Sequence, residues 1–305
     1  MLPNQVFVQL RKKEWDNRRH LKQRLRNQRA FPIEISLKAP TGQQTFSDMQ
    51  HFHVFFTVWK NFVYPDLVVW QQRKYQQLAE QLVPVKLVIP NLNVLVELLG
   101  QQKQLKHWMD KISVFLQQNF VQPQHEQVLF ETLIEYLEQL EQYSEQDWHL
   151  LMSLIAQLKA NMGAGHYLRA LPLQQVDTKF LECNLVLVEA ICNVLHEGEV
   201  QALGGLLAWL NCLDRPKGWL TIKPLCPQVQ QRLGGLPIFQ LSSDVLAQFE
   251  LPAERIIVVE NIQSGLALPS LNNSIVVCGG GKKYRMDGCR LVKAKTSQLL
   301  GRYRF

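Results

Sequence analysis

A chain of 305 residues is long enough for two or three domains, and its 47% hydrophobic and 19% charged residues are ordinary for a globular protein. No stretch reaches the roughly 18 consecutive apolar residues of a membrane span, and the first residues lack the basic-then-apolar pattern of a secretory signal. We therefore expect a cytoplasmic protein with no membrane partner. The six cysteines show no C-x-x-C spacing, which favours reduced thiols.

The formal net charge of +7 is concentrated in two segments. Residues 11–29 hold nine Lys or Arg against two acidic residues, and residues 282–305 hold eight against one, so each segment carries +7. Clustered basic charge is the footprint of contact with a nucleic-acid backbone, which makes Arg18, Arg19 and Lys22 candidate DNA-binding residues. A solvated helix face and a basic tail explain the same charges, and both interpretations stay open.

Residues 1–160 are predicted to form a mainly helical domain that contains short strands. Two segments, Phe31–Pro40 and Val83–Pro90, alternate apolar and polar residues and stop at a proline, which is typical of strands. Helix-like sequence follows each of them, at Met49–Trp59 and Leu92–Leu99, and this order hints at a duplicated strand–helix unit. The rest of the domain, rich in Gln and Leu, is expected to form two or three amphipathic helices.

Residues 161–232 are predicted to form a winged-helix-like module. Asp177, or the threonine after it, is expected to cap a long apolar-faced helix, without a full capping box. A short strand is expected at Trp219–Leu225. Arg169 and Lys179 are further DNA-binding candidates, because cations and a helix amino terminus both attract phosphate. Capping and surface ion pairs explain the same residues.

Residues 233–281 are predicted to begin an α/β domain, because strand and helix patterns alternate there. Two unbroken apolar runs, Ile256–Val259 and Ile275–Cys278, are typical of parallel strands covered on both faces. In an open parallel sheet, chemistry collects beyond the carboxyl ends of the strands. Glu260 follows the first run and Gly279–Gly281 follow the second, so we expect them at one edge of the sheet.

Glu260 is the strongest candidate for chemistry, because a carboxylate at a strand end can bind a divalent cation or move a proton in phosphodiester cleavage. A cap or an ion pair is the commoner role of such a residue. Gly279, Gly280 and Gly281 would let the backbone approach a phosphate closely, and a tight turn explains them equally well. Taken alone, these residues indicate a multidomain α+β protein with a nucleic-acid surface as one possible use.

Motifs along the chain then coincide, in the same order, with those of a known family: Glu14-Trp15, Phe31-Pro32, Lys38–Gly42, Val58–Phe62, Val83–Pro90, Tyr167–Glu182, Val258–Pro269 and Val276–Gly281. The segment Tyr167–Glu182 is the most specific, since it is similar to the family's R-x-L-P … V-D-T-K-F-I-E block. The chain resembles the D subunits of Wadjet plasmid-defence systems. These are Toprim-type nuclease subunits related to the A subunit of archaeal-type topoisomerase VI.

The resemblance implies a homodimeric, Mg²⁺-dependent subunit that cuts DNA. Its implied partners are plasmid DNA and a condensin-like SMC complex that delivers this DNA. By motif position, Glu260 matches the Toprim glutamate as a catalytic residue and metal ligand, with Asn261 beside it. The glycines Gly279, Gly280 and Gly281 match the turn after the second Toprim strand.

The last residues depart from the family. The family continues with a helix and a third strand that ends in an aspartate pair resembling Y-W-G-D-I-D, whereas residues 282–305 have Asp287 as their one acidic residue. The codons TTA TTG GGG AGA TAT CGA TTT for Leu299–Phe305 give Y-W-G-D-I-D when they are read from the second base. Because Lys282 and Lys283 allow a run of adenines, we hypothesise that the frame shifts there and that residues 282–305 are an out-of-frame tail.

This departure predicts that the Toprim domain over residues 233–281 is incomplete, with an open strand edge and an uncovered apolar face. A site with one carboxylate would hold Mg²⁺ poorly, since this ion needs several oxygen ligands in strict geometry. We therefore expect a relative of a nuclease that cuts DNA little or not at all. A non-catalytic DNA-binding or assembly subunit, and the product of a decayed gene, stay open as alternatives.

Overall fold

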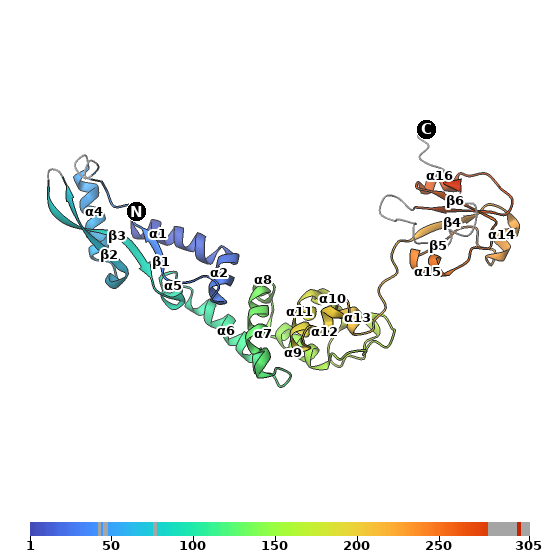
Figure 1. Cartoon of the computed structure of the whole chain (residues 1–305), viewed down its shortest axis with the longest axis horizontal. Coiled ribbons are helices and arrows are strands. Elements are labelled where there is room, and N and C mark those ends of the chain that lie inside the picture. The colour runs from blue at the N-terminus through green and yellow to red at the C-terminus, as the bar shows by residue number, and fades with distance from the viewer. Residues whose placement is uncertain (42–43, 45–47, 76–77, 280–297, 300–305) are drawn as a thin grey trace. The chain divides into compact units, whose positions relative to one another are not determined.

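The computed structural model describes residues 1–41, 44, 48–75, 78–279 and 298–299 (Figure 1). The chain is an α+β protein that divides into two compact units, Met1–Leu213 and Asp214–Phe305. None of the helices in the described ranges combines the length and the hydropathy that crossing a bilayer requires.

The first unit starts with helical segments and a small sheet. The helical segments are α1 (Pro3–Leu10), a π-helical turn (Arg11–Trp15) and α2 (Arg18–Leu25). The antiparallel sheet has the order β1-β3-β2, and its strands are β1 (Ile33–Ser36), β2 (Val68–Tyr75) and β3 (Leu78–Ile89). Helix α4 (Met49–Lys60) packs its aromatic face, Phe52, Phe55 and Trp59, into a core with Val83 and Leu87 of β3.

These elements test the predicted strand–helix pairs. Strand β1 lies within the first proline-terminated segment, and β3 covers most of the second but begins earlier, at Leu78. A helix follows each strand, so the two predicted strand–helix pairs are confirmed. The two strands also pair directly, with Ile33 opposite Ile89. Strand β2 was not predicted, because its sequence from Gln71 onward is polar on both faces and shows no alternation. The strand conformation of β2 therefore depends on its pairing with β3, which the pattern of residues within β2 does not indicate.

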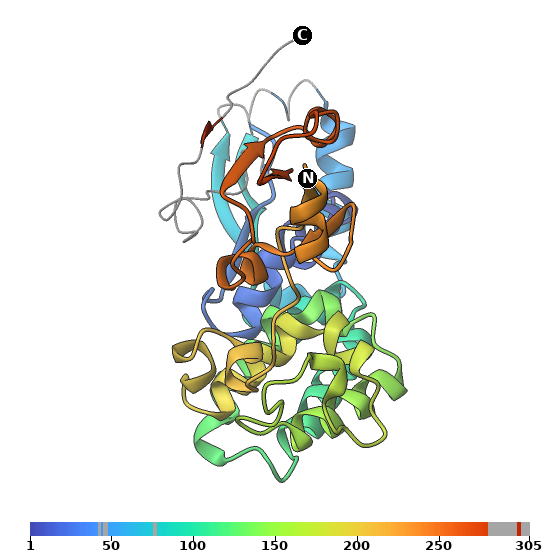
Figure 2. The same cartoon turned by 90° about the vertical axis from the view of Figure 1, so that its right-hand side faces the viewer.

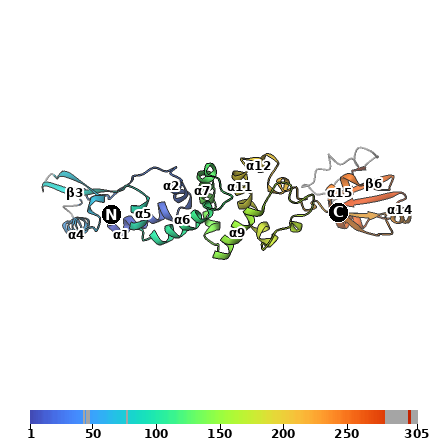
Figure 3. The same ribbon diagram turned by 90° about the horizontal axis from the view of Figure 1, so that it is seen from below.

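A larger helical core completes the first unit; its helices are green and yellow in Figure 2 and labelled in part in Figure 3. Its main helices are α5 (Leu92–Leu98), α6 (Gln102–Leu116), α7 (Glu126–Glu135), α8 (Leu137–Leu140), α9 (Glu145–Gln157), α10 (Thr178–Cys183), α11 (Leu185–Leu195), α12 (Glu199–Ala202) and α13 (Leu206–Trp209). Short 3₁₀ turns lie at Pro65–Leu67, Pro123–His125 and Leu168–Ala170. Trp15 from the N-terminal segment enters this core and stacks on Trp108, with ring centroids 5.4 Å apart.

The helix expected after Asp177 begins as predicted and then breaks. The Asp177 side chain accepts a hydrogen bond from the Lys179 amide at 2.8 Å, which confirms the cap. The predicted single helix is divided into α10 and α11 at Asn184, which has a non-helical conformation. Asn184 is buried and donates to the Phe180 carbonyl at 2.8 Å, while its side-chain oxygen accepts from the Tyr143 hydroxyl at 2.6 Å. At the break, the buried side-chain amide of Asn184 therefore has hydrogen-bond partners for both its oxygen and its nitrogen, as buried polar groups require.

The second unit is built on a five-stranded sheet in the order β5-β4-β7-β6-β8. Its elements are β4 (Leu220–Pro224), α14 (Pro227–Arg232), β5 (Phe239–Leu241), α15 (Ser243–Gln248), β6 (Arg255–Val259), α16 (Ile262–Leu266), β7 (Ser274–Cys278) and β8 (Gln298–Leu299). Strands β6 and β7 are the two predicted apolar runs, and they pair in parallel as predicted. Every residue of β7 is buried, as a central strand requires.

Two expectations for this region need correction. The strand Leu220–Pro224 lies within the predicted 161–232 module, but it pairs antiparallel with β7 and β5 and so belongs to the second unit's sheet. Its partner β7 lies about fifty residues later in the chain, so local sequence could not indicate the pairing. The edge of β6 is also not open, because Gln298–Leu299 pair with it in parallel. The remainder of the predicted tail, residues 282–297 and 300–305, lies outside the described residues.

Candidate functional site

The carboxyl ends of β6 and β7 lie side by side, as the sequence predicted. Val259 is opposite Cys278 in the parallel register, so Glu260 and Gly279 are the next residues along the two strands. The Gly279 amide donates a hydrogen bond to the Val259 carbonyl at 3.2 Å. The Glu260 side chain is exposed at this edge. The structure therefore brings together the carboxylate and the first glycine of the predicted site, and Gly280 and Gly281 lie outside the described residues.

Asn261 has a structural role at this edge. Its side-chain oxygen accepts hydrogen bonds from the amides of Gln263 at 2.8 Å and Ser264 at 3.3 Å, and it caps the amino terminus of α16. An amide side chain in this position satisfies donors that the first turn of a helix leaves unpaired. The same oxygen is thus already engaged, which removes it as a simple metal ligand in this arrangement.

Gly279 has a backbone conformation that explains why glycine stands there. Its φ is +96°, in the region that side-chain-bearing residues rarely adopt. A Cβ at this position would lie 3.7 Å from the Ile262 side chain and 4.0 Å from the carbonyl oxygen of Trp219, the residue before β4. The start of β4, the start of α16 and the end of β7 therefore meet at this glycine. Trp219 itself is 56% exposed.

Two residues that sequence analysis missed hold α16 in place. Gly265 lies so close to β7 that a Cβ there would overlap the Sγ of Cys278. Lys223 of β4 donates from Nζ to the carbonyls of Leu266 at 2.6 Å and Leu268 at 3.3 Å, at the carboxyl end of α16. A glycine inside a helical pattern and a single lysine inside an apolar strand were the signals that could have identified them.

The cysteine at the end of β7, Cys278, is fully buried. Burial raises the pKa of Cys278, and the opposing effect of nearby Lys223 is smaller. A thiol reacts and binds metals through its ionised form, which this environment disfavours. Cys278 therefore serves as a small apolar residue against which α16 packs.

The residues at this edge do not fit a Mg²⁺ site by themselves. Mg²⁺ needs near-octahedral coordination by oxygen, usually with one or two carboxylates supplemented by phosphates and water. The edge supplies the carboxylate of Glu260, while the oxygen of Asn261 caps α16. Within the described ranges, no group of three or more His, Cys, Asp or Glu side chains is gathered anywhere in the chain. We derive no chemical step through a metal from these residues.

The basic segment 11–29 contacts acidic helices of its own unit. Arg18 donates to both carboxylate oxygens of Glu141 at 2.8 Å, and its guanidinium lies 5.4 Å from the centroid of the Trp108 ring. Lys22 pairs with Glu138 at 2.6 Å. These are intramolecular contacts between residues more than a hundred positions apart. Arg19, the third candidate of this segment, is exposed on the same helix.

Of the two DNA-binding candidates in the middle of the chain, Arg169 is held in an ion pair and Lys179 is exposed. Arg169 forms a two-pronged ion pair with Glu182, with N–O distances of 3.0 and 2.9 Å. Hydrogen bonding to Glu182 raises the pKa of Arg169, which stays a cation in any case. Lys179 is exposed at the first turn of α10, beside the Asp177 cap. The ion-pair and capping interpretation therefore holds for Arg169 and Asp177, and DNA contact by any of these residues stays a prediction.

Comparison with protein families gives two matches in chain order. Residues 3–192 match the family model described as "Uncharacterized protein conserved in bacteria N-term (DUF3322)". Residues 205–299 match the model described as "Wadjet protein JetD, C-terminal", and this match extends through β8. No curated protein matches the chain.

Proposed function

The chain belongs to the Wadjet JetD family, and we propose that it engages plasmid DNA as a subunit of a Wadjet defence system. In this proposal an SMC complex of the same system delivers the DNA, and two copies of the chain act together. The two family matches support the proposal because together they span nearly the whole chain.

The second unit is the part that we propose to be Toprim-like. Its parallel strands β6 and β7, joined through α16, place Glu260 at a shared carboxyl edge. This is the position at which open parallel sheets bind ligands. We propose in addition that residues 161–213, the helical part of the predicted 161–232 module, contribute a DNA-binding surface. Lys179 on that surface and Arg19 on α2 are both exposed and are the candidates for phosphate contact.

We propose further that a polypeptide of this sequence engages DNA without cutting it. The observation that carries this step is the ligand set at the edge, where the described residues supply one carboxylate, Glu260. Phosphodiester cleavage by a metal requires that the ion be held firmly enough to polarise the phosphate and position the attacking oxygen. One carboxylate is the smallest protein contribution that Mg²⁺ sites use, and it leaves the other coordination positions to water and DNA phosphates, so the DNA rather than the protein would determine where the ion lies.

A plasmid assay tests this proposal. Supercoiled plasmid, Mg²⁺, the purified chain and its SMC partners would be incubated, and both DNA binding and the open-circular product would be followed. We expect DNA binding with no nicking, in the wild-type chain and in Glu260→Gln alike. Mg²⁺-dependent nicking that Glu260→Gln abolishes would overturn the non-cutting proposal, and loss of all DNA binding would overturn the engagement with DNA.

A second candidate, a cutting subunit, is favoured by the position of β8. This strand pairs in parallel with β6, with Leu299 opposite Val258, so its carboxyl end points to the edge that carries Glu260. In the shifted frame that we hypothesise, the aspartate pair would follow position 299 shortly and reach the same edge. Sequencing the DNA from the Gly279 codon onward tests whether that frame exists. A shifted-frame version of the protein should then nick plasmid in Mg²⁺, and its Glu260→Gln variant should not.

A further inference from the structure

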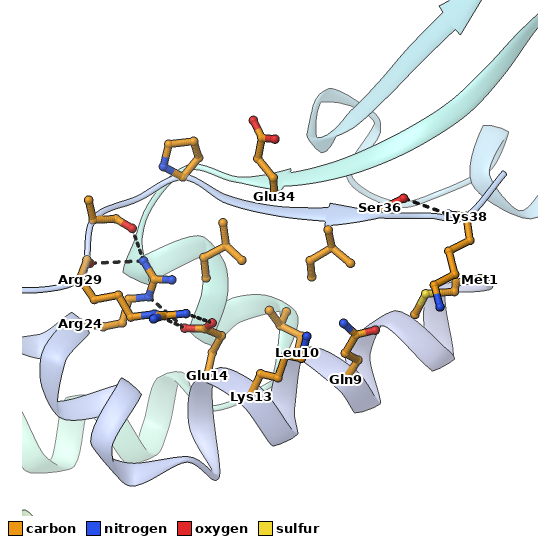
Figure 4. Close-up of a pocket in the computed structure, with 14 residues that line it drawn as sticks. Met1, Gln9, Leu10, Lys13, Glu14, Arg24, Arg29, Glu34, Ser36 and Lys38 are labelled. Carbon is orange, nitrogen blue, oxygen red and sulfur yellow. Dashed lines mark hydrogen bonds and ion pairs between the residues drawn. The ribbon is translucent and has the colours of Figure 1, made fainter. Parts of the chain in front are cut away.

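A groove lies in the first unit, between the α1 helix with its π-helical extension and strand β1 (Figure 4). Its volume is about 760 Å³, which is within the range of ligand-binding pockets. Residues on both walls line it, including Gln9, Leu10 and Lys13 on the helix and consecutive residues of β1. Strand β3 contributes none of the lining residues, so the groove is on the side of β1 that faces away from its partner strand.

Among the described residues, no strand pairs with the backbone edge that β1 presents to this groove. It is the end strand of its sheet, in the order β1-β3-β2. The Leu37 amide donates to the Val85 carbonyl at 2.9 Å, in the same register that pairs Ile35 with Leu87. Because hydrogen-bonded residues alternate along an antiparallel strand, the amides and carbonyls of Glu34 and Ser36 point away from β3. They form a short row of donors and acceptors on the open edge.

The groove has an apolar floor and an excess of positive charge. Leu10, Ile33 and Ile35 are buried and form the floor. In Figure 4 the Arg29 side chain lies at one end and the Lys38 side chain at the other.

Both carboxylates that line the groove are already paired. Glu14 binds Arg24 and Arg29, each at 3.0 Å, and the Glu34 side chain, which points away from the helix in Figure 4, pairs with Lys86 at 2.8 Å. Lys13 and Lys38 are exposed and have no ion pair among the described residues. The groove therefore has uncompensated cations along its length.

We propose that this groove binds an extended acidic peptide segment of a partner protein, which adds to the sheet as a new strand beside β1. The open edge would hydrogen-bond the peptide backbone, and the cations would select carboxylate side chains. Four strand residues at about 3.3 Å each give an edge of roughly 13 Å, enough for a short peptide.

The chemistry of the edge favours a peptide over a phosphate ligand. A peptide backbone offers one donor and one acceptor per residue and can satisfy both the amides and the carbonyls of Glu34 and Ser36. A phosphate or nucleic-acid backbone offers acceptors alone in this role and would leave those carbonyls unpaired. The apolar floor also suits alternate side chains of a strand, because successive residues point to opposite faces.

Selection from a library of short random peptides displayed on phage, with the full-length chain as the target, tests the proposal. Selected peptides should be rich in Asp and Glu at alternate positions and should bind in fluorescence polarisation with a measurable Kd. The variant Ser36→Pro removes an amide from the open edge and leaves the β1–β3 ladder intact, since proline is tolerated where the N–H faces outward. It should weaken binding at least about tenfold without lowering the unfolding temperature.

A charge test and an amide-exchange test complete the design. Lys13→Glu combined with Lys38→Glu should abolish binding, whereas Lys12→Glu makes the same type of charge change on an exposed residue outside the groove and should have no effect. Bound peptide should slow amide hydrogen exchange at Glu34 and Ser36, and Ile35 should be protected already in the free protein.

Each of three results with peptides would overturn the proposal. They are a failure to recover any binding peptide, selected peptides without acidic bias, and peptides whose affinity Ser36→Pro leaves unchanged. A single-stranded DNA oligonucleotide that binds with sensitivity to the Lys13 and Lys38 changes but not to Ser36→Pro would show a general anion site and would also overturn it.

Discussion

The two units of this protein use charged residues in opposite ways. In the first unit, Glu14 is 4% exposed and binds two arginines, and Lys22 of α2 pairs with Glu135 of α7 and Glu138 of α8. In the second unit, the notable carboxylate, Glu260, lies exposed at the end of β6, a strand whose last three residues are half-buried. The basic segment 11–29 thus contributes ion pairs that hold helices of the first unit together, whereas Glu260 lies at an edge of the second unit's sheet that solvent reaches.

Breaking the buried ion pair should have the largest effect. Burial alone would raise the pKa of Glu14, but hydrogen bonds from Arg29 and Arg24 outweigh it and hold the pKa below its ordinary value. Glu14→Ala would leave the Arg24 guanidinium, 3% exposed, without its carboxylate. We expect the free energy of unfolding of the first unit to fall by about 3–5 kcal/mol, measured by hydrogen exchange resolved along the chain.

The matched control for this variant is Glu34→Ala. Glu34 pairs with Lys86 in the same unit, but both side chains are about half exposed, so the expected loss is at most about 1 kcal/mol. Equal losses for the two variants would contradict the view that burial determines the value of the pair. Glu14→Ala should leave the free energy of unfolding of the second unit unchanged. An equal loss there would contradict the assignment of this ion pair to the stability of the first unit alone.

A smaller effect is expected where the second unit depends on close packing. In Gly265→Ala the new methyl group would overlap the Sγ of Cys278, and overpacking of this kind costs about 1–3 kcal/mol. Hydrogen exchange of β6 and β7 amides would measure the loss. Combining the change with Cys278→Ala should recover part of it, because the overlapping atom is then absent. Purely additive losses would show that strain at α16 has another origin.

Acid should reproduce part of the Glu14 effect. A carboxyl whose folded pKa is lowered adds stability that is fully present above its unfolded value, about 4.3, and is lost as the pH falls through the folded pKa. The first unit should therefore lose stability on the acidic side of this value. Glu14→Gln, compared with the wild type by chemical unfolding between neutral and acidic pH, should show a weaker dependence there. An unchanged dependence would assign the acid loss to other carboxyls.

The smallest of these effects concerns the cap of α16. Asn261→Ala removes the acceptor for two amides and should cost about 1 kcal/mol, confined to the amides of α16 in hydrogen exchange. Asn261→Asp keeps the acceptor and should preserve the protection. If Asn261→Ala leaves α16 unaffected, the residue stands at this edge for a reason other than capping.

The sequence predicted the elements whose causes are local. The unbroken apolar runs identified β6 and β7, and Asp177 was identified as a cap, because each depends on residues within one short segment. Glu260 was placed at the strand edge for the same reason. Strand β4 was grouped with the helices before it because its partners, β7 and β5, lie later in the chain.

Long-range pairing also explains what was missed in the basic segment. Arg18 and Glu141 are 123 positions apart, and nothing near Arg18 indicates a carboxylate partner. Lys223 and Gly265 were overlooked because their importance depends on how closely α16 lies against β4 and β7. Periodicity predicts which face of an element is buried, but the distance between two packed elements is set by side chains that only the fold brings together.

Trp219 gives the second unit an optical signal of its own. It is the one tryptophan among residues 214–305, and the other six belong to the first unit. The residue is 56% exposed and its carbonyl oxygen adjoins Gly279, whereas Trp15 and Trp108 are buried and stacked. Long-wavelength fluorescence, obtained as the difference between the wild type and Trp219→Phe, should therefore report on the Glu260 edge, without any attached dye.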